Sequence, residues 1–125
     1  MNYASVTELK LRFPETAGFG DNDDDIEDFL LTPAEAEIDS RFSGYYEVPF
    51  LQTPPLVKDL ALSLALIRAL ENVDVERARK LRVFTDERIF SLTKGTEVLT
   101  GVNGQPLHKM REIKVWSNTP GTGSF

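Results

Sequence analysis

The chain has 125 residues, 41% of them hydrophobic and 27% charged, which is the composition of one globular domain with its own core. A formal net charge of −6 argues against a dedicated nucleic-acid binder, which would carry a basic excess to neutralise phosphates. The absence of cysteine excludes disulfides, thiolate metal sites and a cysteine nucleophile. We expect no signal peptide and no membrane partner, because the longest uncharged apolar run, residues 60–67, is too short to span a bilayer.

The first predicted helix follows a capping box. Ser5 and Glu8 have the spacing at which a serine oxygen and a glutamate reach reciprocally for free amides at a helix start. The helix is predicted over residues 6–13, because Pro14 then interrupts it.

An acidic run, DNDDDIED, covers residues 21–28 and places six carboxylates in eight positions. A calcium loop starting at Asp21 would need glycine where Ile26 stands and a bidentate glutamate where Thr32 stands. A contiguous run also cannot by itself gather ligands around magnesium. We therefore expect no metal site here, and predict a solvated loop leading into a helix near residues 25–31, with the acids at its positive N-terminal end.

A second helix is predicted to begin at Thr32, with Pro33 at its first position and Glu35 at its third. An apolar residue then recurs every fourth position, and Gly44 is suited to a left-handed cap. Residues 45–50 (YYEVPF) are predicted to form an extended, aromatic-rich connector.

The third predicted helix starts at Thr53-Pro54-Pro55 and runs to about Leu70. It is apolar on nearly all sides, which predicts the central element of the fold or of an interface. Asp74 is predicted to cap a fourth helix, residues 75–92, which has a narrower apolar stripe. Five cations crowd the remaining surface of this helix: Arg77, Arg79, Lys80, Arg82 and Arg88. We favour an ordinary outer face or a salt-bridged surface over a phosphate-binding face, because acids are interspersed among them.

Beyond Gly95 the pattern changes to short strand-like stretches at residues 97–99 and 113–115, separated by turn residues. His108, the only histidine, is interpreted as a solvated loop residue, and the last eight residues have too little apolar content to fold alone. The chain shows neither a phosphate-binding glycine loop nor a nucleophile motif, so we predict no enzyme, no catalytic residues and no cofactor.

The apolar third helix, the aromatic connector and a tail with Trp116 and Phe125 supply more apolar surface than one small domain is expected to hide.

The order of these features resembles the small head–tail connector proteins of tailed bacteriophages, in particular a family from Mu-like prophages. The resemblance rests on "MNYASVTELKLRF", "AEIDSRFSGYYEVPF", "TPPLVKDLALSLALIRALE" and a charged helix ending in "LTKG". It covers nearly the whole chain and is strongest over residues 37–70. The acidic run is more acidic than the family's segment at this place.

The resemblance implies a mainly α fold, a four-helix adaptor-type bundle with a short β-like or irregular C-terminal tail. It implies a helical connector domain over residues 1–100 and a flexible tail over 101–125 that orders on assembly. The protein would be a structural virion protein, made in the host cytoplasm. It would form a ring, expected to be twelve-fold, below the portal protein. The ring would extend the DNA channel and bind a tail, stopper or tail-completion protein, while DNA passes without sequence-specific binding.

Within this hypothesis, certain residues become candidates for contacts between subunits, and charged residues become candidates for the channel or a partner surface. The subunit-interface candidates are Tyr45, Tyr46, Val48, Phe50, Leu62, Leu66, Trp116 and Phe125. The charged candidates are Asp23, Asp24, Asp25, Arg79 and Arg82. The alternative is a small helical DNA-binding or regulatory module that uses the basic face of the fourth helix.

Overall fold

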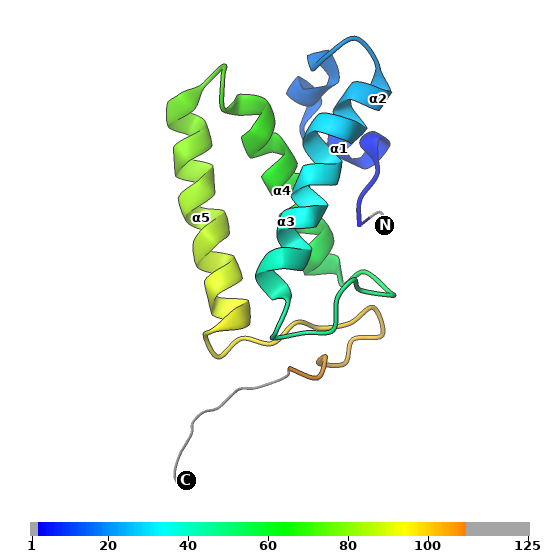
Figure 1. Ribbon diagram of the computed structural model, residues 1–125, viewed down its shortest axis with the longest axis vertical. Helices are drawn as coiled ribbons and strands as arrows, with labels where there is room; N and C mark the ends of the chain where they lie inside the picture. The colour runs from blue at the N-terminus through cyan, green and yellow to red at the C-terminus, as the bar shows by residue number, and fades with distance from the viewer. Residues whose placement is uncertain (1–2, 110–125) are drawn as a thin grey trace, which may run out of the picture.

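The computed structural model describes residues 3–109, and this part of the chain is mainly helical, as predicted (Figure 1). No β-strand forms within it; two isolated β-bridges occur instead. The elements are α1 (Val6–Arg12), the 3₁₀ turn η1 (Pro14–Gly18), α2 (Asp23–Ile26), the π-helical turn η2 (Glu27–Leu31), α3 (Thr32–Phe42), α4 (Pro55–Leu70) and α5 (Val75–Thr93). The four predicted helices correspond to α1, α3, α4 and α5.

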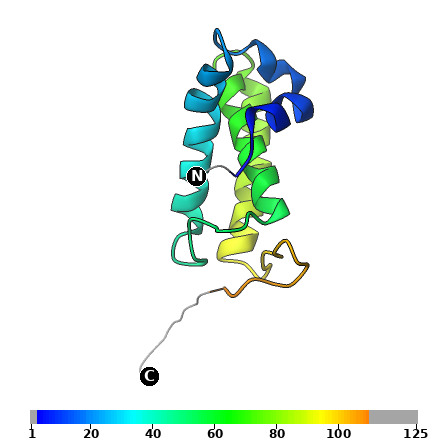
Figure 2. The ribbon, with the colours of Figure 1, turned by 90° about the vertical axis from the view of Figure 1, so that its right-hand side faces the viewer.

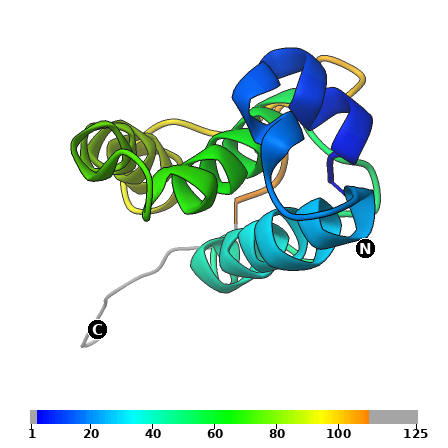
Figure 3. The same ribbon diagram turned by 90° about the horizontal axis from the view of Figure 1, so that it is seen from above.

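Helix α4 is the centre of the fold. Viewed along the bundle, α5 lies beside one side of α4, while α1 and α3 lie beside its other sides (Figure 3). Nine of its sixteen residues are buried, as expected from its apolar composition: Val57, Leu60, Ala61, Leu62, Leu64, Ala65, Leu66, Ile67 and Leu70. Each fully buried leucine contributes about 1.5–3 kcal/mol relative to an exposed one, so α4 supplies much of the stability of the core.

The predicted helix ends are mostly confirmed. The Ser5 hydroxyl accepts from the Glu8 amide and the Glu8 carboxylate accepts from the Ser5 amide, which completes the capping box of α1. Asp74 caps α5 by accepting from the Arg77 amide. Gly44, with a φ of +89°, follows α3 in the left-handed region that glycine adopts without steric cost.

Helix α3 begins at Thr32, as predicted, but Thr32 does not cap it. Helical backbone runs without a break from Asp23 through η2 into α3, and the Thr32 amide donates to the Glu27 carbonyl five residues back. Pro33 has no amide and its ring crowds the carbonyl four residues earlier, and a wider π turn directly before it accommodates such a residue inside a helix. Glu35 is also not part of a capping box, because its carboxylate accepts from the amides of Tyr3 and Ala4.

The predicted strand at residues 97–99 does not form. The chain folds back on itself there, with a bridge between Thr100 and Pro106 and a 2.8 Å hydrogen bond from the Leu107 amide to the Leu99 carbonyl. Leu99 is fully buried, so this turn is attached to the core rather than extended as a sheet. The second predicted strand, residues 113–115, lies outside the described residues.

Both loop segments close the same end of the bundle. Residues 43–54 connect α3 to α4, and residues 95–109 follow α5; they lie next to each other below the helices, while α1 and α2 lie at the other end (Figure 2). This end of the molecule contains four of the six described residues that were predicted to contact other subunits.

Candidate interaction surfaces

The aromatic connector packs inward. Phe42, Tyr46 and Phe50 form a cluster with Tyr3, with ring centroids 5.8–6.3 Å apart and mostly edge-to-face geometry. Tyr46 and Phe50 are only 1% and 5% exposed, so their prediction as exposed interface residues is corrected. In the folded chain their side chains contribute to the core and are not accessible to a second subunit.

The Tyr46 hydroxyl connects three segments. It donates to the Leu92 carbonyl at the end of α5 (3.0 Å) and accepts from the Leu99 amide (3.1 Å). Burial raises the pKa of this phenol above its ordinary value. Sequence reasoning missed the role because the two partners lie 46 and 53 residues away along the chain.

A second network holds the N-terminal segment against α3. The Tyr3 hydroxyl donates to Asp39 and accepts from the Phe50 amide at 3.0 Å, while the buried Glu35 carboxylate accepts from the Tyr3 amide at 2.6 Å. Burial raises the pKa of Glu35 and of the Tyr3 phenol. These polar residues have a structural role, which their sequence positions did not indicate.

The remaining apolar candidates divide into three groups. Leu62 and Leu66 are each 1% exposed and belong to the core of this chain, which corrects their prediction as interface residues. Tyr45 and Val48 are half-buried and keep part of their side chains at the surface. Trp116 and Phe125 lie outside the described residues.

The acidic run forms the capped start of a helix, as predicted. Asn22 caps α2 by accepting from the Asp25 amide, and the Asp25 carboxylate accepts from the Asp21 amide at 2.8 Å. Asp23 pairs with Lys10 at 2.9 Å, while Asp24 is exposed. Within residues 3–109 no group of carboxylate or histidine side chains is arranged to hold a metal ion.

The basic face of α5 is largely neutralised by carboxylates of the same chain. Arg82 donates to Glu37 at 2.7 Å, and Arg79 pairs with Glu76 one turn earlier. Arg77 pairs with Glu15 and Arg88 lies 3.9 Å from Glu97. Lys80 is the one cation of the five with no carboxylate partner among the described residues.

Glu37 lies near arginines from three helices, an arrangement that the sequence did not indicate. Its carboxylate faces Arg41 of α3, Arg68 of α4 and Arg82 of α5, at distances of 3.3, 3.9 and 2.7 Å. Because each arginine comes from a different helix, this carboxylate ties the three long helices together. Arg82 is therefore engaged within the chain, which leaves Arg79 as the more accessible of the two predicted basic candidates.

Large apolar side chains are exposed along α5, among them Val83, Phe84 and Phe90, which we call the α5 apolar residues. At about 100° per residue, Val83 and Phe90 lie on one flank of the helix, whereas Phe84 lies on the other flank, beside residues 56–63 of α4. Phe84 is 73% and Phe90 57% exposed, unusual for phenylalanine in a folded chain. Two further large apolar side chains, Leu11 of α1 and Phe29 of η2, are exposed on elements across the molecule from α5 (Figures 1 and 3).

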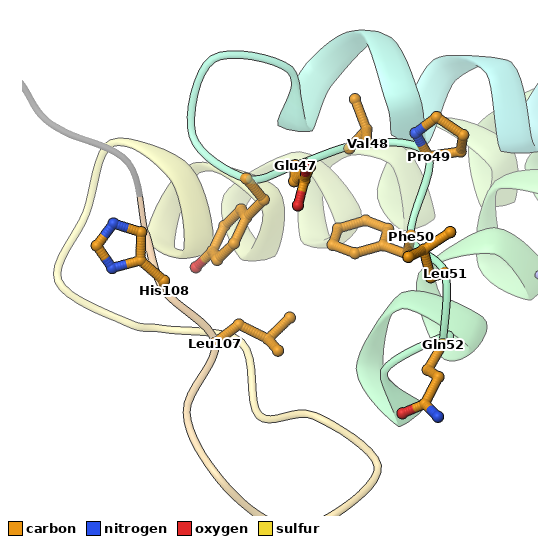
Figure 4. A pocket seen from close by; sticks show the side chains of 9 residues that line it. Glu47, Val48, Pro49, Phe50, Leu51, Gln52, Leu107 and His108 are labelled. Atoms are coloured by element: carbon orange, nitrogen blue, oxygen red, sulfur yellow. The ribbon is translucent and has the colours of Figure 1, made fainter.

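A groove of about 670 Å³ opens between the connector and the segment after α5 (Figure 4). We call it the connector groove. It is lined by Tyr46, Glu47, Val48, Pro49, Phe50, Leu51, Gln52, Leu107 and His108. Leu51 is 95% exposed, and His108 is exposed as predicted. The lining is mainly apolar, with Glu47 and His108 as its exposed titratable side chains.

Comparison with protein-family models and with curated protein sequences finds no match to this chain. None of the helices within residues 3–109 has the length and apolar content needed to cross a membrane.

Proposed function

We propose that this chain is a structural adaptor of the head–tail connector of a tailed phage or prophage, assembling as a ring below the portal. The sequence resemblance described above and the mainly α fold support the proposal. In this role the chain joins head to tail, encloses the passage for DNA and binds the portal and a tail-completion protein. Its site is in the virion, at the head–tail interface.

The observation that carries the proposal is the distribution of exposed apolar side chains. A closed ring is built from heterologous contacts, in which one surface of each subunit meets a different surface of the next. The exposed α5 apolar residues supply anchors on one side of the bundle, and Leu11 and Phe29 belong to elements on its other side. Exposed aromatic residues of this kind are the usual anchors of protein interfaces.

The charge distribution is consistent with the same role. The acidic start of α2 lies at the end of the bundle opposite the connector groove (Figure 1). Carboxylates exposed along a DNA passage repel the duplex and keep it from adhering as it moves. Asp24 and Asp25, together with the partly paired Asp23, are the residues that we place in this role.

The test is substitution of Phe84→Asp, with Val102→Asp as the matched control, since both side chains are more than half exposed and neither change opens a core cavity. Interface anchors contribute about 2 kcal/mol or more, so the first variant should weaken each subunit contact by about thirtyfold or more. Light scattering should then show assembly for wild type and the Val102 variant, and its loss for the Phe84 variant.

Two results would overturn the proposal. One is assembly of the Phe84→Asp variant at the same concentration as wild type. The other is salt-dependent binding of duplex DNA by the monomer through α5, lost on Lys80→Gln, which is the signature of the DNA-binding alternative.

A further inference from the structure

The wall of the connector groove has unused backbone groups. Among the described residues, the amides of Glu47, Val48, Leu51 and Gln52 donate to no protein acceptor, whereas the Phe50 amide donates to Tyr3. An irregular wall with free amides above an apolar floor suits an extended peptide, whose backbone pairs with the wall while alternate side chains enter the groove.

The described chain ends beside this groove. His108 lines it, and Lys109 is fixed next to it, since its ammonium group donates to the carbonyls of Gly95 (2.8 Å) and Glu97 (3.1 Å). Sixteen residues follow Lys109 in the sequence. An extended chain advances about 3.3 Å per residue, so Ile113 comes within about 13 Å and Trp116 within about 23 Å of this anchor.

The chemistry of residues 110–116 (MREIKVW) complements the groove. At Ile113-Lys114-Val115 one cation stands between two apolar residues, the alternation of a half-buried extended segment. The groove lining contains the acid Glu47, and residues 110–116 carry a net positive charge, with the cations Arg111 and Lys114 and the single acid Glu112. Leu51 presents an apolar side chain that nothing in the described structure covers.

We propose that the connector groove is a peptide-docking site whose occupant is residues 110–116 of the same chain. The tether favours the chain's own segment over that of a second copy, because a site a few residues away experiences an effective concentration in the millimolar range. The segment therefore docks in the monomer, which differs from the expectation that the tail orders only on assembly. This inference does not depend on the proposed ring.

Trp116 provides a direct readout because it is the only tryptophan in the chain. The experiment compares its emission maximum and its quenching by acrylamide in the full-length wild type, in Leu51→Asp and in the control Val73→Asp. Leu51 and Val73 are both strongly exposed, but Val73 lies in the turn between α4 and α5, outside the groove lining. Each measurement is repeated in the Phe84→Asp background, so that subunit assembly cannot shield the indole.

Docking predicts a blue-shifted emission and a quenching constant several times lower than that of free N-acetyltryptophanamide. These properties should be lost in Leu51→Asp and retained in Val73→Asp. In hydrogen exchange, the amides of Val48 and Leu51 should exchange at least about tenfold more slowly in wild type than in full-length Ile113→Asp.

Three results would overturn the proposal. The first is an indole in wild type as accessible as the free compound. The second is shielding that survives Leu51→Asp unchanged, which would place the segment elsewhere. The third is shielding that disappears on dilution or in the Phe84→Asp background, which would identify a second copy as the occupant.

Discussion

Substituting Tyr46→Phe tests whether the hydroxyl at the base of the bundle holds the chain together after α5. The change removes one oxygen and leaves the ring and its packing in place. Two buried groups lose their partner: the Leu92 carbonyl, one of the free acceptors at the end of α5, and the Leu99 amide. A buried group left unpaired costs about 1–3 kcal/mol, so the two together should destabilise the fold by about 2–6 kcal/mol.

The assay is urea denaturation followed by far-ultraviolet circular dichroism, with Tyr45→Phe as the control. Tyr45 is the neighbouring residue and is half-buried, but its hydroxyl has no hydrogen-bond partner among the described residues. The control should unfold within about 0.5 kcal/mol of wild type. A Tyr46→Phe variant as stable as the Tyr45→Phe variant would refute the reasoning.

Two further predictions concern carboxylates with shifted pKa values. Lys58 donates to Glu8 at 2.6 Å and lowers the pKa of this carboxylate. The stability from this contact is therefore present above the ordinary pKa and is lost as the pH falls through the lowered one. In Glu8→Gln, the free energy of unfolding should depend less on pH in that acidic range. Burial raises the pKa of Glu35, so its contribution is present below the ordinary pKa and lost as the pH rises through the raised one. Glu35→Gln retains an acceptor for the two amides and should be at least as stable as wild type at pH 7. Glu35→Ala should lose about 2–4 kcal/mol of stability. Thermal melts across pH that show equal stability for the two variants would contradict this.

The sequence was sufficient to predict the helices because their signals are local. The capping box at Ser5, the cap at Asp74 and the left-handed Gly44 each depend on residues within one turn. The all-round apolar composition of α4 identified the centre of the fold. The cap predicted at Thr32 does not form although it has the same local form, because the Glu35 carboxylate binds the N-terminal segment and the preceding residues are already helical.

The interaction surfaces were harder to predict, since burial depends on contacts between distant segments. Tyr46 and Phe50 were predicted to contact other subunits, yet the connector that carries them folds under the helices and meets Tyr3, more than forty residues earlier. The sequence does not indicate that Phe84 and Phe90 are exposed, because phenylalanine is usually buried in a folded chain. Their exposure follows from the position of α5 at one side of α4, which only the tertiary structure gives.

The most direct test of the adaptor proposal is the mass and shape of the assembled protein. Full-length chain should be examined by sedimentation and by negative-stain electron microscopy over a wide concentration range. The proposal predicts closed rings of one copy number, many times heavier than the 14.1 kDa chain and with a central opening wide enough for duplex DNA. A single 14.1 kDa species at every concentration, or an open filament without a ring, would contradict it.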